Sequence, residues 1–471
     1  MRKKNTRQIF ENVAVVDAGA KGKAIAKAPD GRVIFLQNAV PGDVVTIQTT
    51  KKRKAYFEGI VTQIHEYSDK RTSPKCQHFG LCGGCKWQNM SYDHQLYYKQ
   101  REVENNLKRI GHLDIPELLP IKGSEEQYFY RNKMEFSFSD SRWLFPEELK
   151  QEGPIADKNA LGLHIPGMWD KVLDLKECHL QRDPSNTIRL EIKSFATQQG
   201  LPFFNPRSQE GLLRTLLIRT ASTGELMVLI QFAKEDKSSR ELILDHLVKT
   251  FPEITSLLYV INQKQNDTLY DQDVICYNGR DHIWEEMEGL RFRIDAKSFY
   301  QTNSAQAHEL YKIVRDFANL KGGELVFDLY TGTGTIAQFI AKKAAKVIGI
   351  EVVPEAIEGA VTNAKENGIT NTEFIVGDMK SVLNDTITDK YGVPDVLITD
   401  PPREGMHKEV VEQLLKMAPN RIVYVSCNSA TQARDLSLLK EDYKILKVQA
   451  VDMFPQTHHV ENVVLLEKRN A

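Results

Sequence analysis

The sequence lacks long hydrophobic runs. No segment offers roughly 18 consecutive apolar residues without charges, which excludes a transmembrane helix. The first residues are basic, but no apolar stretch of signal-peptide length follows them, so we expect a cytoplasmic protein with no membrane partner. Cysteine is also scarce, with six in 471 residues. In the cytoplasm a disulfide framework is not expected, and the cysteines need another explanation.

Internal repeats and low-complexity tracts are absent too, and a chain of this length predicts about three domains. The net charge of −1 conceals an uneven distribution. Residues 1–75 contain 15 Lys or Arg and 7 Asp or Glu, a net charge of +8 (15 − 7). A basic region on an otherwise acidic protein favours a polyanionic partner, although charge alone is equally compatible with a solvated surface.

Three regions differ in their patterns. Residues 1–70 contain short strand-like runs between turn signals such as "APDGR" and "VPGD", which predicts a small β-barrel. "KKRK" at 51–54 precedes Tyr56 and Phe57, a mixture of cations and aromatics typical of single-strand binders. The range 71–300 is predicted to be a β-rich α+β region with a helix at 96–111. In 301–471, strands and helices alternate, which predicts a Rossmann-like, doubly wound sheet and places the chain in the α/β class.

A glycine-rich stretch, "DLYTGTGT" at 328–335, follows a predicted strand and opens a helix. Gly332 and Gly334 permit a ligand to approach the backbone closely. Glu351, at the end of the next strand, can bind ribose hydroxyls. The third glycine of the dinucleotide fingerprint is absent, which disfavours NAD(P) and favours S-adenosylmethionine. A purely structural turn is the alternative.

Two later strands end in chemically active residues. "ITDPPREG" places Asp400 after one strand, and "VYVSCN" places Cys427 after the next. Because parallel strands of such a sheet end at one edge, we expect both side chains there. A cysteine nucleophile needs a partner that handles protons. "MFPQTHHVENVVLLEK" offers His458, His459 and Glu461.

These motifs resemble, in order, those of the S-adenosylmethionine-dependent RNA uracil-5-methyltransferases. "FYQTN" at 299–303 resembles the segment that precedes the methyltransferase domain of that family. The basic barrel looks like a TRAM domain, an OB-like RNA-binding module. The resemblance covers nearly the whole chain, more loosely between 120 and 290. Gln456 departs from it, because relatives often have His there.

The resemblance implies a function for the site. Cys427 would be the nucleophile that adds to carbon 6 of uracil, and Glu461 the base that removes the proton from carbon 5. Family members with a barrel and a cysteine cluster resemble 23S rRNA enzymes, so 23S rRNA is the expected substrate and tRNA the alternative. We expect a monomer. The implied contacts to S-adenosylmethionine, together with the two loop glycines, are Gln301, Tyr330, Gly332, Gly334, Glu351, Asp378 and Asp400.

The other cysteines suggest a metal site. Cys76, Cys82 and Cys85 have the spacing C-x5-C-x2-C, and Cys178 lies far downstream in "KECHL". From the residues alone, zinc and an iron–sulfur cluster compete, and His78 or His179 could replace a thiolate around zinc. A subgroup of the family has cysteines at these four positions, which implies a 4Fe-4S cluster with a structural role. The remaining cysteine, Cys276, belongs to no motif and is expected in the core.

Two other functional classes remain open. An amino-methyltransferase also uses a DPP-type loop, but needs neither Cys427 nor Glu461. A non-catalytic RNA-binding factor would keep the basic barrel and would tolerate the loss of both residues.

Overall fold

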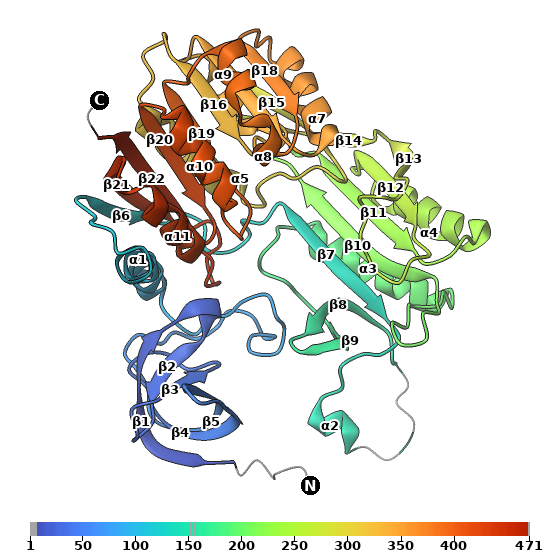
Figure 1. Ribbon diagram of the computed structural model, residues 1–471. Coiled ribbons are helices and arrows are strands. Elements are labelled where there is room, and N and C mark those ends of the chain that lie inside the picture. The colour runs from blue at the N-terminus through green and yellow to red at the C-terminus, as the bar shows by residue number, and fades with distance from the viewer. Residues whose placement is uncertain (1–6, 151–152, 154–156, 470–471) are drawn as a thin grey trace.

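The computed structural model describes residues 7–150, 153 and 157–469, and three parts are visible in it (Figure 1). The basic residues at positions 2–4, which contribute to the predicted charge excess, lie outside the described residues. Among the helices of the described part, none combines the length and the apolar character that a membrane crossing requires.

The N-terminal part is a closed barrel, which confirms the predicted one. Its strands follow the order β1-β2-β3-β5-β4. Alternate side chains such as Ile34, Leu36 and Ile47 fill its core. Lys51 and Lys52 end β4, so the "KKRK" cations lie on the hairpin to β5. The elements are β1 (Ile9–Ala18), the 3-10 turn η1 (Ala20–Gly22), β2 (Ala24–Lys27), β3 (Val33–Leu36), β4 (Val44–Lys52) and β5 (Tyr56–Glu66).

The central part is a seven-stranded sheet of order β13-β12-β11-β10-β7-β8-β9, with α3 and α4 packed on one face. Cys276 lies on the edge strand β13 and is exposed, so the prediction that it belongs to the core is wrong. The elements are β7 (Lys133–Ser139), α2 (Pro146–Leu149), β8 (Ala160–Ile165), β9 (Met168–Asp174), α3 (Ser185–Gln198), β10 (Leu213–Thr220), β11 (Leu226–Phe232), α4 (Lys237–Thr250), β12 (Ser256–Ile261) and β13 (Ile275–Gly279).

The C-terminal part is an eight-stranded sheet of order β18-β17-β16-β19-β20-β22-β21-β6. Its strands from β18 to β20 run parallel, and β22 is antiparallel to both neighbours, which confirms the Rossmann-like prediction. The strands are β16 (Leu325–Leu329), β17 (Lys346–Glu351), β18 (Thr372–Val376), β19 (Val396–Thr399), β20 (Arg421–Ser426), β21 (Tyr443–Val451) and β22 (Glu461–Lys468). The hairpin β14 (His282–Met287) and β15 (Leu290–Asp295) precedes them.

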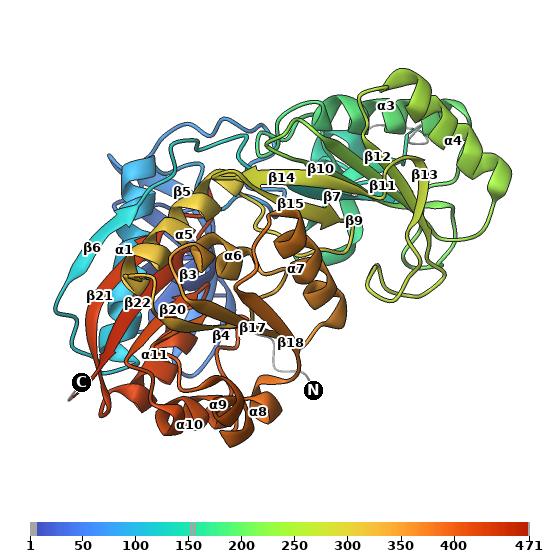
Figure 2. The ribbon, with the colours of Figure 1, turned by 90° about the horizontal axis from the view of Figure 1, so that it is seen from above.

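Helices cover both faces of this sheet, as Figure 2 shows. One face carries α5 (Ser304–Ala318), α6 (Thr335–Ala341) and α7 (Pro354–Glu366). The other face carries α8 (Met379–Val382), α9 (Asp385–Tyr391), α10 (Lys408–Met417) and α11 (Ser429–Leu439).

An earlier segment of the chain completes this part. The helix expected at 96–111 spans Tyr92–Arg109 (α1) and packs on α11. The strand β6 (Leu118–Lys122) pairs with β21 at the sheet edge. Helix α1 and strand β6 lie within the predicted central range 71–300, but they belong to the C-terminal part.

A fully buried ion pair joins α1 to the segment before β22. Lys99 Nζ lies 2.6 Å from Asp452 Oδ1, and both side chains are inaccessible to solvent. Tyr92 donates its hydroxyl to Asp452 Oδ2 at 2.9 Å, and Lys99 also donates to the Phe454 carbonyl at 3.1 Å. Burial lowers the pKa of Lys99, while the carboxylate of Asp452 opposes that shift. Every charged atom of the pair thus has a partner, which a buried pair needs to be tolerated.

Removing one member of the pair should destabilise the protein strongly. Lys99→Met keeps the side-chain length but leaves Asp452 charged and buried, which should lower the free energy of unfolding by about 3–5 kcal/mol. Denaturant unfolding followed by circular dichroism measures the change. Lys108→Met is the matched control, because its i,i+4 pair with Glu104 on the same helix is exposed and should leave stability almost unchanged. Equal effects of the two variants would contradict the burial described.

Candidate active site and cysteine cluster

The predicted catalytic residues meet at one edge of the C-terminal sheet. Asp400 directly follows β19, and Cys427 directly follows β20. Glu461 is the first residue of β22, which runs antiparallel to β20 with Ser426 paired to Asn462. The end of β20 and the start of β22 are therefore neighbours, and the thiol and the carboxyl group share the same environment.

This environment holds several acidic groups and is largely shielded from solvent. Burial raises the pKa of Cys427 to about 11, and the charges of Glu461 and Asp400 add to the shift. Burial, with Asp400 nearby, raises the pKa of Glu461 to about 8. Part of the Asp400 residue is accessible to solvent, but its carboxyl group is buried. This burial, with the charge of Asp328, raises the pKa of Asp400 to about 7. Burial likewise raises the pKa of Asp328 to about 7. The thiol is therefore mostly protonated at neutral pH without a ligand.

Arg403 is a site residue that sequence reasoning missed. Its guanidinium is the group that opposes these shifts, because it lowers the pKa values of both Cys427 and Glu461. Asn428 and Thr431 donate side-chain hydrogen bonds to the Arg403 carbonyl at 2.9 and 3.1 Å, which ties its loop to the start of α11. The sequence did contain a signal for Arg403, because it is a cation directly after the "DPP" of "DPPREG".

The segment 452–461 is positioned by parts of the chain far from it in sequence. Gln95 of α1 donates to the side-chain oxygen of Gln456 at 3.0 Å and accepts from the Gln456 backbone N–H at 2.9 Å. The backbone N–H groups of Lys86 and Trp87 both donate to the Gln456 carbonyl, at 2.9 and 3.1 Å. Three of these bonds fix the Gln456 backbone, and the fourth gives its side-chain oxygen a donor from Gln95.

The two histidines of the same segment lie against each other, with ring centroids 4.1 Å apart. Burial is the first cause that lowers their pKa values, to about 3 for His458 and about 4 for His459. Both rings are therefore neutral at physiological pH. They offer hydrogen bonds and ring faces rather than a positive charge.

The glycine-rich loop has the backbone that its sequence predicts. Gly332 and Gly334 have φ values of 55° and 74°, in the left-handed region that glycine favours. A Cβ on Gly334 would come within 2.8 Å of Phe374, whereas one on Gly332 would meet no atom within 4 Å. Gly332 donates its N–H to Glu351 Oε2 at 3.2 Å. Packing against Phe374 thus requires a glycine at position 334, whereas Gly332 faces open space.

Beside this loop lies a cavity of about 680 Å³. Tyr330 and Asp378 line it together with Val352, which directly follows Glu351. A nucleoside fits such a mixture of ring, apolar and acidic groups. Gln301 does not line this cavity. Its carbonyl accepts a hydrogen bond from Asn132 Nδ2 at 2.9 Å, at the boundary with the central part.

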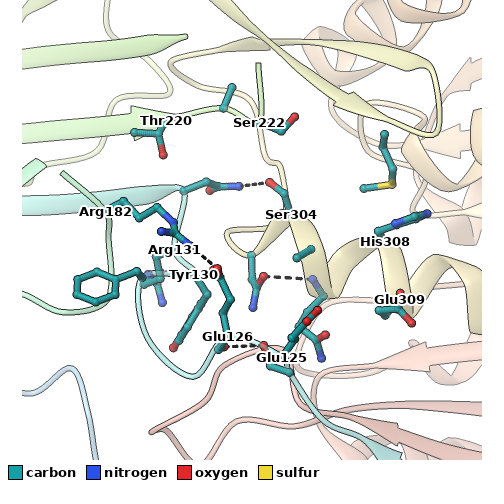
Figure 3. Close-up of a pocket in the computed structure, with 18 of the residues that line it drawn as sticks. Glu125, Glu126, Tyr130, Arg131, Arg182, Thr220, Ser222, Ser304, His308 and Glu309 are labelled. Atoms are coloured by element: carbon teal, nitrogen blue, oxygen red, sulfur yellow. Dashed lines mark hydrogen bonds and ion pairs between the residues drawn. The ribbon is translucent and has the colours of Figure 1, made fainter. Parts of the chain in front are cut away.

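A second cavity, of about 1000 Å³, lies between the central part and the start of α5 (Figure 3). Asn132 donates to Ser304 Oγ at 2.9 Å, and Arg182 pairs with Glu126 across the opening. Among the described residues that line it, none is a predicted catalytic, cofactor or metal residue. Several of its charges are paired within the protein, among them Lys122 with Glu309 and His308 with Glu288.

The cysteines of the predicted metal site come together. Cys76, Cys82, Cys85 and Cys178 line one enclosed cavity with Leu163, Leu175 and Leu180. Within the described residues, no three of these sulfurs lie within 4.8 Å of one another. His78 does not line the cavity and accepts a hydrogen bond from the Lys176 N–H at 3.0 Å. His179 lines it, beside the fourth cysteine.

Asp281, His282 and Asp295 form another compact group. Arg293 already pairs with both carboxylates, at 2.9 and 3.0 Å. A cation thus stands among these acids, and the group has no need of a metal ion.

Comparison with known proteins gives three findings. The model of the family described as tRNA (uracil-5-)-methyltransferase matches residues 276–469. RNA methyltransferases, named as uncharacterized, are 56% identical in Bacteroides thetaiotaomicron (96% of this chain, 100% of that one) and 54% in Porphyromonas gingivalis (96% and 98%). The solved structure of Pyrococcus abyssi tRNA (uracil-54, C5)-methyltransferase with S-adenosyl-L-homocysteine is 28% identical, with a TM-score of 0.74 over 96% of this chain and all of that one.

The electrostatics of the site can be tested through the reactivity of Cys427. At mildly alkaline pH the carboxyl groups of Glu461 and Asp400 are ionised, and their charges disfavour the thiolate of Cys427. Glu461→Gln removes one of these charges, so it should lower the pKa of the thiol and speed its alkylation, about tenfold for each pKa unit. Arg403→Met should raise the pKa and slow the reaction. Peptide mass spectrometry after iodoacetamide treatment measures both rates. The exposed Cys276 in the same samples is the control, because its rate should not change. Unchanged alkylation of Cys427 in both variants would refute the arrangement.

Proposed function

This chain belongs to the S-adenosylmethionine-dependent RNA (uracil-5-)-methyltransferases, and from that premise we propose that it acts as a monomer on 23S rRNA and methylates carbon 5 of a uridine through a covalent bond to Cys427. The observation that supports the proposal best is the meeting of a thiol, Cys427, and a carboxyl group of raised pKa, Glu461, at one sheet edge.

The reaction needs both groups because carbon 5 of uracil is a poor nucleophile. S-adenosylmethionine supplies an electrophilic methyl group on a positively charged sulfur. The thiolate of Cys427 adds to carbon 6, and the displaced electron pair forms an enolate whose carbon 5 takes the methyl group. Glu461 then accepts the proton from carbon 5, and the electron pair left behind expels the thiolate and restores the ring.

The raised pKa of Glu461 suits this role. A carboxylate with a pKa of about 8 is a stronger base than an ordinary one, and roughly a tenth of it is ionised at pH 7. Its protonated fraction rises as the pH falls below that value, so proton removal should slow in acid. Arg403 favours the ionised forms of both Cys427 and Glu461, so it assists the step in which each carries a charge.

The cofactor roles follow from the placement of the motif residues. Tyr330 and Asp378 would contact the nucleoside in the 680 Å³ cavity, and Glu351 would bind its ribose hydroxyls. Gly332 and Gly334 would allow the amino-acid end to approach the backbone. Two further contacts are proposed, from Asp400 at the reacting edge and from Gln301 near the start of α5.

Two classes of RNA are candidates for the substrate. The barrel combined with a cysteine cluster supports 23S rRNA. The names of the matching family and of the Pyrococcus abyssi enzyme refer to tRNA, which supports tRNA as the second candidate. In either case the cations on the β4–β5 hairpin would contact the phosphate backbone.

The two catalytic residues should fail in different ways. Cys427→Ala should abolish methylation and form no adduct, because the enolate never arises. Glu461→Gln should still add and methylate but fail to remove the proton, so a protein–RNA adduct should accumulate. A denaturing gel detects the adduct as a shifted band that requires S-adenosylmethionine.

Sequencing the RNA released from that band identifies the substrate. Fragments of 23S rRNA would support the proposal, and tRNA would support the second candidate. The double variant Cys427→Ala/Glu461→Gln is the matched control and should give no band. Substantial activity of Cys427→Ala would disprove the nucleophile and favour an amino-methyltransferase.

We also propose that Cys76, Cys82, Cys85 and Cys178 hold a 4Fe-4S cluster. The donor set fits, because four thiolates in an apolar enclosure are the usual ligands of such clusters. A single zinc ion bound by thiolates is the alternative. Methyl transfer involves no redox step, so the cluster would serve to hold its loop in place.

Metal analysis tests this proposal directly. Anaerobically purified protein should be brown and contain about four iron and four sulfide per chain. Cys82→Ser should lose iron and stability, whereas Cys276→Ser at the exposed β13 strand should keep both. One equivalent of zinc with no iron would contradict the cluster.

A further inference from the structure

One aromatic side chain on the central part is exposed and has no role in the chemistry described so far. Trp169 is the second residue of β9, after the tight turn at Pro166 and Gly167, and 63% of its surface is accessible. Met168, the first residue of β9, is 42% exposed. The two side chains expose neighbouring apolar surface at a hairpin tip, and apolar surface rimmed by polar residues marks contact sites.

The indole is held from one side. The Arg207 guanidinium lies 5.8 Å from the ring centroid, and Arg207 Nε donates to Asp170 Oδ2 at 2.6 Å. Asp170 is itself buried, so the guanidinium is anchored by a fixed partner. One face of the indole thus has a cation over it, and that cation also suits a negatively charged ligand.

A shallow cavity of about 660 Å³ connects this indole to the loop of the cysteine cluster. Trp169 and Pro166 line one side of it, and Gly83 and Lys86 line the other. A Cβ placed on Gly83 would lie 3.4 Å from Pro166 Cγ, so the loop packs directly on the hairpin tip. Both sides of the cavity are therefore positioned by packing.

Lys86 links this cavity to the active site. Its side chain is close enough to lower the pKa of His458, and its N–H holds the Gln456 carbonyl. A Cβ on Gly22 of the barrel would lie 3.0 Å from Lys86 Cβ and 3.3 Å from His458 Cβ. His459 follows His458 in the chain, and the charge of Arg403 lowers the pKa of His459. Lys86 therefore lies both against the segment that leads to Glu461 and on the cavity that Trp169 lines.

We infer that Trp169 is a stacking platform for an unpaired base of the RNA substrate, on the strand that flanks the methylated uridine. The strand leaves the active site along His459, His458 and Lys86, and one of its bases lies on the open face of the indole. The inference rests on the proposed function in placing the target uridine at Cys427. Stacking on an aromatic side chain beside cations is how proteins hold single-stranded RNA without reading its sequence.

Base stacking and phosphate contacts respond differently to salt, which provides the test. With the full-length protein and a short single-stranded oligoribonucleotide of mixed sequence with one central uridine, Trp169→Ala should raise Kd about 5- to 100-fold. The slope of log Kd against log salt should not change, because no phosphate contact is lost. Trp169→Phe should retain most of the affinity. RNA should quench the fluorescence of wild type, and this quenching should be absent in Trp169→Phe.

The controls separate this inference from the proposed function. Tyr270→Ala removes another exposed aromatic residue, 75% accessible and in the loop between β12 and β13, and should leave Kd unchanged. Adduct formation by Glu461→Gln reports on the chemistry independently of Trp169. If the Kd of Trp169→Ala for the RNA lies within twofold of the wild-type Kd, the inference is wrong. That result is also the one expected if this surface binds a protein instead of RNA. A decreased salt slope would also overturn it.

Discussion

The arrangement of the active site depends on the buried contact between Lys99 and Asp452. Helix α1 precedes the segment 452–461 by more than three hundred residues in the chain, yet the ion pair and the Gln95–Gln456 amide pair hold the two together. That segment leads directly into Glu461. The N–H groups that follow Cys85 bind the same segment, so the proposed cluster, by stabilising the cysteine loop, would also stabilise the edge that carries Glu461. The proposed metal site and the proposed catalytic base would thereby be coupled without any shared chemistry.

Like charges at the mouth of the sheet are the second constraint. Asp328, Asp400 and Glu461 converge there, and burial raises the pKa of each. Burial and the charges of Glu461 and Asp400 disfavour the thiolate of Cys427, and Arg403 is the cation that opposes them. A cofactor with a positive sulfur suits such an edge, because its charge favours the ionised forms of all four groups. The reactivity of the site is therefore expected to follow cofactor binding.

The central part and the C-terminal part share one hydrophobic core, in which Leu217 and Leu229 cluster with Leu310 and Val326. The barrel adds a separate junction, where Gly22 of the barrel, Lys86 of the cysteine loop and His458 of the segment 452–461 lie against one another. This junction brings the barrel next to the segment that leads to Glu461. The substrate of this family is RNA, and a strand that crossed this junction would contact the barrel, the cysteine loop and that segment.

The sequence by itself determined the local features: the barrel, the alternation of strands and helices, the two glycines, and the residues at the ends of β19, β20 and the loop before β22. These depend on short-range periodicity and on motifs within a few residues, which a linear chain displays directly. It misplaced Cys276, because an apolar run does not reveal that its strand lies at a sheet edge. Only the tertiary structure decided that α1 and β6 join the C-terminal sheet, that Gln95 hydrogen-bonds Gln456, and that Arg403 lies near Cys427 and Glu461. Each of these is a contact between residues that are distant in the chain. Such contacts depend on which elements pack together, and a local sequence pattern does not specify that.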